Sequence, residues 1–409
     1  MRNANNKTVF SIQNFLIGIT ALLAAIIVIL NILQIKSAIN QSGLSEQAMT
    51  INGTIDAITQ LKQSLALERT AISAAYNFEG VPSSVFKTTI IKNRQSAQGA
   101  YRSVLDGIEE LPNFPGKQGL LSSLQTAFTA YSENQDNIYA GLDITKDEGR
   151  KRTRTVLMPL SDLLDETVKV RSAIENEFDL GSQELYAVMR LKKQLWLLTE
   201  YASQESAVFA AAIAANEPID ETSLIIASEY NGIAKASWNQ AVAIASSSLV
   251  NSEIHNQVAN INHKFFGNFE GDPCIENQDC PDSFVDVKFS LYDTSTEMKE
   301  AEEEGYEEDV TYALNSEEWL NRADEAAAPI SQMAKAADDL ASQLNDEAVS
   351  NATNERNFAF LVLILVLAIA GIAFFIIRFR VIKPINSISD TMIILADGNL
   401  DIEVPYGDR

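Results

Sequence analysis

The sequence predicts an all-α fold: a membrane-anchored helical-bundle domain between two transmembrane helices, followed by the first part of a coiled coil. Two observations predict it. Two uncharged apolar runs, Phe15 to Ile35 and Asn357 to Ile377, enclose residues 36–356. That interior segment has apolar residues at three- and four-residue steps and few of the alternating patterns that are typical of strands.

Each apolar run is long enough to cross a bilayer as a helix, which takes ~20 residues. The first run has no small-residue cleavage site and exceeds the ~7–15 apolar residues of a signal peptide, so we expect a retained anchor. The positive-inside rule places residues 1–14 and 378–409 in the cytoplasm and residues 36–356 outside it. The basic residues that decide this orientation are Arg2, Lys7, Arg378, Arg380 and Lys383.

The segment between the apolar runs is strongly acidic. It holds 25 of the 31 basic and 50 of the 55 acidic residues, a net charge near −25. Such a charge repels nucleic acid and anionic lipid surfaces, so we expect no nucleic-acid partner. The few polar side chains inside the apolar runs argue against a proton or ion path, and so against a transporter or channel.

The two cysteines, Cys274 and Cys280, lie in a Pro-bounded loop on the outer side. An oxidising compartment favours a local disulfide between them. The alternative is a bound metal ion, although the spacing of the nearby carboxylates matches no calcium-binding loop. These carboxylates are Asp272, Glu276, Asp279 and Asp282. The two histidines, His255 and His263, have no thiolate near them in the sequence, so we predict no metal site and no cofactor.

Apolar stripes mark the bundle helices. One stripe comprises Ile51, Ile55, Ile58, Leu61, Leu65, Ile72 and Ala75, and a second comprises Leu191, Leu195, Leu198, Ala202, Phe209 and Ala212. The last outer helix is predicted to begin at Ser316, an N-cap residue followed by two glutamates that favour the helix dipole. No proline follows between Ile330 and Ile377, so this helix can continue into the second apolar run.

Clusters of Pro and Gly predict the breaks between helices: Gly80 to Pro82, Leu111 to Gly116, Asn216 to Pro218, and Gly267 to Asp293. The last of these favours short strands or an irregular lid. The acidic run Glu297 to Asp309 predicts a solvated charge run rather than a cation site. The basic cluster from Arg150 to Arg154 predicts an exposed turn before a helix, with contact to an anionic ligand as the alternative.

An internal repeat is visible in the outer segment. LERTAISAAY (67–76) aligns with QESAVFAAAI (204–213), each is followed by a proline, and Glu68 matches Glu205 at an offset of 137 residues. Each copy leads into a further helical segment, 85–110 and 221–250. A duplicated helical hairpin explains this pattern, with the two copies in one bundle or in two stacked bundles.

The repeat places charge where helical periodicity predicts core. Glu68 and Arg69 interrupt the first stripe and Glu205 interrupts the second. Burying unpaired charge is costly, so these groups need partners. One alternative is an ion pair of Arg69 with Glu205 or Glu68; the other is that Arg69 binds a small anionic or polar ligand between helices. Aromatic residues near these positions could form the walls of such a pocket, namely Tyr76, Trp196 and Tyr201.

The repeated segments resemble the two helical signatures of the NIT (nitrate- and nitrite-sensing) domain family of bacterial receptors, over roughly residues 45–265. The Glu-Arg pair of the first signature is matched by Glu68 and Arg69. The resemblance implies an all-helical, ligand-sensing bundle. The second signature of the family has arginines beside its glutamate, where this chain has Gln204 and Ser206 beside Glu205. That difference removes positive charge from the expected anion site, so the sequence does not identify the ligand.

Residues 380–409 resemble the first helix and connector of a HAMP domain, the relay that follows the last membrane span of bacterial receptors. Pro384 is expected to open this helix, because its missing N–H is harmless there. The residues matching the coiled-coil seam, the turn and the connector are Ile385, Ile388, Met392, Leu395, Gly398 and Leu400. The resemblance implies a parallel homodimer, of whose relay domain this chain supplies only the first part.

Together these features predict a receptor in a bacterial inner membrane that senses an external small ligand or a ligand-loaded binding protein and passes the signal to cytoplasmic proteins, chiefly in chemotaxis. A regulated histidine kinase or cyclic-dinucleotide enzyme is the alternative output, and a membrane-tethered scaffold without a small ligand is a third reading. No catalytic motif is present in the sequence, so we expect no enzyme activity from these residues.

Overall fold

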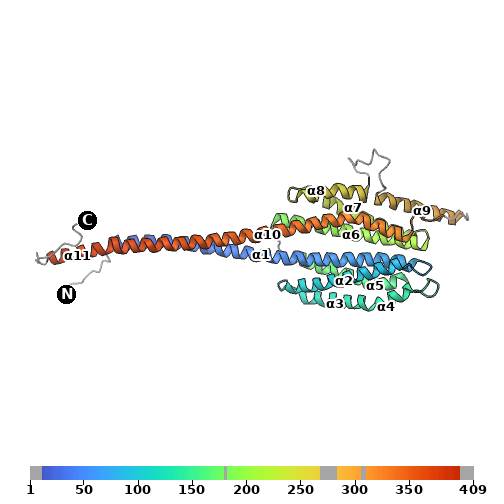
Figure 1. The fold of residues 1–409 in the computed structure, drawn as a ribbon, viewed down its shortest axis with the longest axis horizontal. Helices are drawn as coiled ribbons and strands as arrows, with labels where there is room; N and C mark the ends of the chain where they lie inside the picture. The colour runs from blue at the N-terminus through green and yellow to red at the C-terminus, as the bar shows by residue number, and fades with distance from the viewer. Residues whose placement is uncertain (1–11, 179–181, 268–282, 305–309, 397–409) are drawn as a thin grey trace, which may run out of the picture. The chain divides into compact units, whose positions relative to one another are not determined.

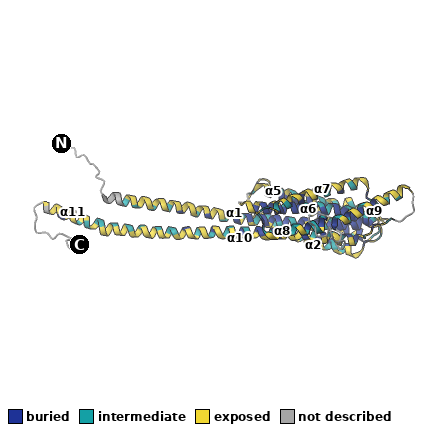
Figure 2. Cartoon of the chain, turned by 90° about the horizontal axis from the view of Figure 1, so that it is seen from above, coloured by how far each residue is buried: buried dark blue, intermediate teal, exposed yellow. Residues whose placement is uncertain are grey.

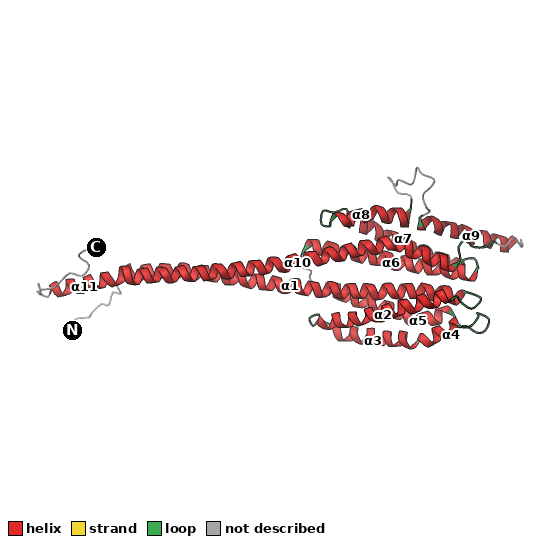
Figure 3. Cartoon of the chain, in the orientation of Figure 1, coloured by secondary structure: helices red, strands yellow, loops and turns green. Residues whose placement is uncertain are grey.

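The computed structural model describes residues 12–178, 182–267, 283–304 and 310–396. All regular secondary structure in these residues is helical, as predicted (Figure 3). The chain divides into two compact units. We call Ser45–Asp346 the bundle unit, and Met1–Leu44 together with Glu347–Arg409 the terminal unit.

The elements follow one another as α1 (Ile12–Asn77), α2 (Ser84–Glu110), α3 (Lys117–Glu133), α4 (Gln135–Leu142), α5 (Thr153–Glu177), α6 (Gln183–Ala215), α7 (Glu221–Ala245), α8 (Ser252–Ile261), the π-helix η1 (Asn262–Phe266), α9 (Phe284–Glu304), α10 (Ser316–Ile376), the π-helix η2 (Ile377–Ile382) and α11 (Lys383–Ala396). Helices α1 and α10 each carry residues of both units. The remaining helices through α9 belong to the bundle unit (Figure 1).

The helices that follow the two repeated segments bury residues at equivalent positions. Helix α2 follows the first sequence repeat and α7 follows the second, so the two expected helical segments are confirmed, although α7 ends at Ala245, earlier than expected. Each buried residue of α7 lies 137 positions after a buried residue of α2: Ala227 after Ile90, Ala234 after Ala97, Ser237 after Ala100, Trp238 after Tyr101, Ala241 after Val104, and Ala245 after Ile108. The two hairpins therefore bury the same faces.

The terminal unit contains both predicted apolar runs, each inside a long helix. The described residues include two helices that are long and apolar enough to cross a membrane. Their large apolar side chains are exposed, such as Leu22 at 62 % and Ile364 at 68 % (Figure 2). A surface of this kind is unfavourable in water and favourable in lipid, so the terminal unit has the character of a membrane protein.

The predicted start of α10 is confirmed, but its cap lies one residue earlier. Asn315 Oδ1 accepts hydrogen bonds from the backbone N–H groups of Glu317 and Glu318, both at 3.0 Å. The Glu318 carboxylate accepts the backbone N–H of Asn315 at 2.9 Å. This reciprocal pair is a capping box, which satisfies N–H groups that have no partner inside the helix.

Helix α9 occupies part of the region that was expected to be irregular. It starts with a second capping box, in which the Ser283 hydroxyl accepts the Asp286 N–H at 3.2 Å and the Asp286 carboxylate accepts the Ser283 N–H at 3.1 Å. The Ser-x-x-Asp capping box therefore starts a helix inside the range where Pro and Gly predicted strands or an irregular segment. Residues 268–282, with the predicted disulfide Cys274–Cys280, lie outside the described residues.

Arg150 is buried, unlike the rest of its cluster: Lys151, Arg152 and Arg154 are exposed where α5 begins, as predicted. The Arg150 guanidinium donates to backbone carbonyl oxygens of Ala75 at 3.1 Å, Gly80 at 2.8 Å and Gly141 at 2.9 Å. The last carbonyls of a helix lack partners within it, and the end of α1 at Asn77 leaves several of them free. Arg150 supplies the missing donors, so its charge serves the end of α1.

Pro384 lies inside continuous helix rather than at a helix start. The preceding residues Ile377–Ile382 form η2, and the N–H of Lys383 bonds to the carbonyl of Arg378, five residues back. A π-helical turn of this kind accommodates a proline, which lacks an N–H and would clash with the normal spacing. Gly398 and Leu400 lie outside the described residues.

Candidate functional site

A buried polar cluster lies where α1 packs against α6 in the bundle unit. Arg69 Nη1 lies 3.3 Å from Glu200 Oε1, and Lys62 Nζ lies 3.5 Å from Glu200 Oε2. Gln204 donates to the same carboxylate at 2.5 Å. Lys62 and Arg69 are seven residues apart, about two helical turns, so both reach α6 from one face of α1. Two cations and an amide therefore share one carboxylate.

This cluster has a surplus of positive charge. Burial raises the pKa of Glu200, but the charges of Arg69 and Lys62 outweigh burial and hold that pKa below its ordinary value. Burial lowers the pKa of Lys62 to about 8, Glu200 opposes this shift, and Arg69 adds to it. The mutual repulsion of the cations would be relieved by one more negative charge.

Arg69 also lines a cavity of about 460 Å³ formed by α1, α5, α6 and α7. Its Nε and Nη2 groups are buried and have no hydrogen-bond partner among the described residues. Polar side chains on the cavity wall include Ser73, Asn77, Gln204 and Tyr230. Unused guanidinium donors beside hydroxyl and amide groups suit a small anionic or polar molecule.

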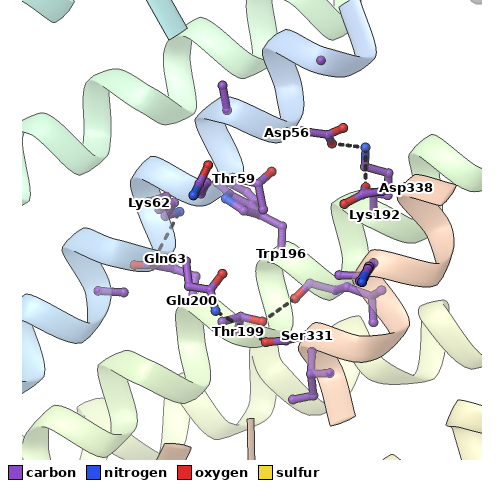
Figure 4. Close-up of a pocket in the computed structure, with 18 of the residues that line it drawn as sticks. Asp56, Thr59, Lys62, Gln63, Lys192, Trp196, Thr199, Glu200, Ser331 and Asp338 are labelled. Atoms are coloured by element: carbon purple, nitrogen blue, oxygen red, sulfur yellow. Dashed lines mark hydrogen bonds and ion pairs between the residues drawn. The ribbon is translucent and has the colours of Figure 1, made fainter. Parts of the chain in front are cut away.

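A second cavity of about 460 Å³ lies between α1, α6 and α10 (Figure 4). Its wall carries six charged side chains, Asp56, Lys62, Lys192, Glu200, Lys335 and Asp338, together with the indole of Trp196. Figure 4 shows Asp56, Lys192 and Asp338 gathered at one end, away from Lys62 and Glu200. Opposite charges therefore alternate along one cavity within the bundle unit.

Lys192 joins three helices at the acidic end of this second cavity. Its ammonium lies 2.8 Å from Asp338 on α10, 2.7 Å from the amide oxygen of Asn52 on α1, and in direct contact with Asp56 on α1. Two carboxylates thus share one ammonium. Burial raises the pKa of Asp56 to about 6, Lys192 opposes this shift, and Asp338 adds to it.

Trp196 lies at the opposite, cationic end of the cavity. Lys62 Nζ is 3.6 Å from the centre of its ring, and the guanidinium carbon of Arg171 is 4.8 Å from it. The negative face of an indole attracts cations, which explains how Lys62 and Arg171 lie near each other. The indole N–H of Trp196 is buried and has no hydrogen-bond partner in the described part of the chain.

The structure separates the charged residues that the sequence analysis grouped. Glu68 accepts from Arg94 Nε at 2.9 Å and from the Tyr131 hydroxyl, whereas Glu205 accepts from Lys288 Nζ at 2.7 Å. The expected pairing of Arg69 with Glu205 or Glu68 is therefore wrong. Helices α2 and α3 supply the partners of Glu68, and helices α7 and α9 supply those of Glu205. Neither glutamate lines the two cavities described above.

The two predicted tyrosines are also apart from these cavities. Tyr76 is buried, and its hydroxyl donates to the carbonyl oxygens of Asn137 at 2.9 Å and Ile138 at 2.8 Å. Tyr201 is half-buried and packs against Tyr230, with ring centres 5.9 Å apart. Tyr230, which the sequence analysis did not select, is the tyrosine on the wall of the Arg69 cavity.

The predicted coiled-coil residues lie in α11, in the terminal unit. Ile385, Ile388 and Met392 are 56 %, 41 % and 64 % exposed. A seam of apolar residues at these spacings has no partner within this chain among the described residues, which is the pattern of a helix that pairs with another helix. Leu395 belongs to the same helix by its backbone.

Comparisons with protein-family models, curated proteins and solved structures give no match for this chain. The described residues contain no group of three or more metal-ligating side chains. The geometry alone therefore defines the class: an all-helical protein with two candidate membrane-spanning helices and polar, charged cavities in its bundle unit.

Proposed function

We propose that this chain is the sensing part of a transmembrane receptor of a bacterial inner membrane. Its bundle unit is periplasmic or extracellular, both ends are cytoplasmic, and the output is chemotaxis signalling. The resemblance of the repeated segments to NIT signatures and of residues 380–409 to a HAMP domain supports this function. A histidine kinase or a cyclic-dinucleotide enzyme is the alternative output.

One observation carries the proposal. Helix α10 spans Ser316–Ile376, so a single helix holds Asp338 on a cavity wall and the second apolar run. A ligand that binds two arrangements of the bundle unequally shifts their populations, and only by that difference in affinity. Because the helix is covalently continuous, a displacement at Asp338 can be transmitted along α10 towards α11.

A homodimer is the second part of the proposal. The exposed seam of Ile385, Ile388 and Met392 favours a parallel pair of α11 helices, since apolar residues at these positions are the contacts of a two-stranded coiled coil. Two arrangements of this pair would carry the signal to the cytoplasmic partner.

The Arg69 cavity is the proposed site for a small anion. The experiment is a thermal-shift screen of the full chain in lipid nanodiscs with nitrate, nitrite and organic acids. We expect a stabilising ligand whose effect disappears in Arg69→Gln and persists in Arg102→Gln, a change at an exposed arginine of α2.

Two results would contradict this assignment. A ligand shift that is unchanged in Arg69→Gln would remove Arg69 from the binding site. The lack of a shift with every compound of the screen would refute an anion sensor and favour a scaffold or a receptor for a binding protein.

A further inference from the structure

The second cavity, between α1, α6 and α10, differs from the Arg69 cavity in its charge pattern. At one end Lys62 and Arg69 share the single carboxylate of Glu200. At the other end Asp56 and Asp338 share the single ammonium of Lys192. Among these ion-paired groups, one end therefore has a surplus cation and the other has a surplus anion; Lys335, the remaining charged side chain of the wall, is exposed and belongs to neither set.

The cationic end has donors ready for a carboxylate. Lys62 is 5 % exposed, and its nearest carboxylate oxygen is 3.5 Å away, longer than a charge-assisted hydrogen bond of ~2.7–2.9 Å. The indole N–H of Trp196 beside it is buried without a partner among the described residues. Buried donors are nearly always hydrogen-bonded in proteins, so the Trp196 N–H indicates an acceptor from a ligand, and the Lys62 ammonium lies beside it.

The acidic end has capacity for an added cation. Asp56 and Asp338 are only partly exposed, with side chains 31 % and 39 % accessible, and both face Lys192. Two carboxylates offer about eight acceptor positions, whereas one ammonium offers three donors. An ammonium group from a ligand would therefore find free acceptors here, and it would reduce the repulsion between the two carboxylates.

A ligand of one charge sign would fit only one end. A simple anion would meet the surplus carboxylate at the acidic end, and a simple amine would meet the surplus cation at the other. We infer that this cavity binds a small zwitterion, an amino acid, with its carboxylate at Lys62 and the Trp196 indole N–H and its ammonium at Asp338 and Asp56. This inference rests on the proposed receptor function and names a ligand class for it.

The position of the site gives such a ligand direct access to α10. Asp338 belongs to α10, and its contact with Lys192 is one of the ties between α10 and α6. A ligand ammonium that shares Asp338 competes with Lys192 for it. Binding would thus redistribute contacts among the three helices that surround the cavity.

Isothermal titration calorimetry on the full chain in nanodiscs tests the inference, with each standard amino acid as the probe. For every amino acid that binds, the matched compounds lacking the amine or the carboxylate are titrated as well; for leucine these are 4-methylpentanoate and isoamylamine. We expect at least one amino acid to bind and its singly charged analogues to bind at least about tenfold more weakly, the loss of one charge-assisted hydrogen bond.

Two substitutions locate the site. Lys62→Met and Asp338→Asn should each weaken amino-acid binding by about tenfold or more, while the matched changes Lys299→Met and Asp339→Asn, at exposed positions of α9 and α10, should leave it unchanged. Circular dichroism verifies that each variant keeps its helices, and Lys62→Arg, which keeps the charge, should restore binding in part.

Three results would overturn the inference: no amino acid binds, the singly charged analogues bind as well as the amino acid, or both Lys62→Met and Asp338→Asn bind normally while folded. The anion screen on Arg69 is independent of these outcomes. A nitrate or organic-acid shift without amino-acid binding would leave the receptor function standing and remove only the zwitterion site.

Discussion

Lys192 and Asp338 form an ion pair of 2.8 Å between α6 and α10. The same ammonium contacts Asp56 and Asn52 on α1. A single lysine, 5 % exposed, therefore ties together α1 and α10, the two helices that also carry the apolar runs. In the proposed receptor, the strength of this tie helps to set which arrangement of the bundle unit is populated.

Replacing Lys192 by Met should destabilise the bundle unit. The change leaves two carboxylates close together without their shared cation, at a cost of roughly 1–3 kcal/mol, below the ~3–5 kcal/mol of fully buried pairs because both carboxylates are partly solvated. Thermal unfolding of the full chain in detergent measures it. Adding Asp56→Asn and Asp338→Asn should recover part of the loss, and a triple variant no better than Lys192→Met would contradict this explanation.

Asp56 should make the stability of the chain depend on pH. Burial raises the pKa of Asp56 from 3.8 to about 6. The charge of Lys192 lowers this pKa, and the charge of Asp338 raises it further. The folded chain therefore holds this proton more tightly than the unfolded chain, so the stabilisation is complete below about pH 4 and is lost as the pH rises through about 6. The melting temperature of Asp56→Asn relative to the natural chain should rise between pH 4 and 8. A difference in melting temperature that stays constant between pH 4 and 8 would contradict the raised pKa of Asp56.

The buried glutamates of the two repeats should depend on their cations. Glu68 and Glu205 are 0 % and 1 % exposed. Removing the partner of either leaves a buried charge, so Arg94→Met and Lys288→Met should each cost about 3–5 kcal/mol. The exposed pair of Lys87 is the control, since Lys87→Met should cost less than about 1 kcal/mol. If chemical unfolding shows the same loss of stability for the buried and the exposed variants, the buried ion pairs do not stabilise the bundle unit as argued.

Helix α11 should cross-link in a dimer through its seam. In a chain with Cys274→Ser and Cys280→Ser, the variant Ile388→Cys should form a disulfide-linked dimer in membranes on mild oxidation, because a parallel pair places the two copies of this position face to face. Ser389→Cys is exposed but off the seam and should link far less. Equal cross-linking at both positions would rule out a specific helix pair.

The sequence predicted those parts of the fold that local patterns determine. Helical periodicity identified the bundle helices, a Pro-Gly cluster marked the break after Asn77, and an N-cap residue followed by two glutamates marked the start of α10 at Ser316. The offset of 137 residues between Glu68 and Glu205 predicted the repeat, and the matching burial of α2 and α7 agrees with it. Such signals are contained within a few helical turns.

The partners of the charges could not be predicted in the same way. Which helix faces Arg69 depends on the packing of distant segments, and its partner Glu200 lies 131 residues along the chain. Lys62 and Lys192 each lie beside an apolar stripe in the sequence, where a lysine is expected at the edge between core and solvent. No local pattern therefore identified either of them as a site residue. Arg150 seemed exposed because its role, capping the end of α1, depends on carbonyls about 70 residues away.

In the proposed receptor, the bundle unit and α11 lie on opposite sides of a membrane. Two single-cysteine variants at exposed positions, Gln118→Cys in α3 and Asn386→Cys in α11, test this topology. The bacterial cells used have a permeabilised outer membrane and an intact inner membrane. With a membrane-impermeant maleimide, we expect labelling at position 118 while the inner membrane is intact, and at position 386 only after the inner membrane is permeabilised. Labelling of both positions from the same side would contradict it.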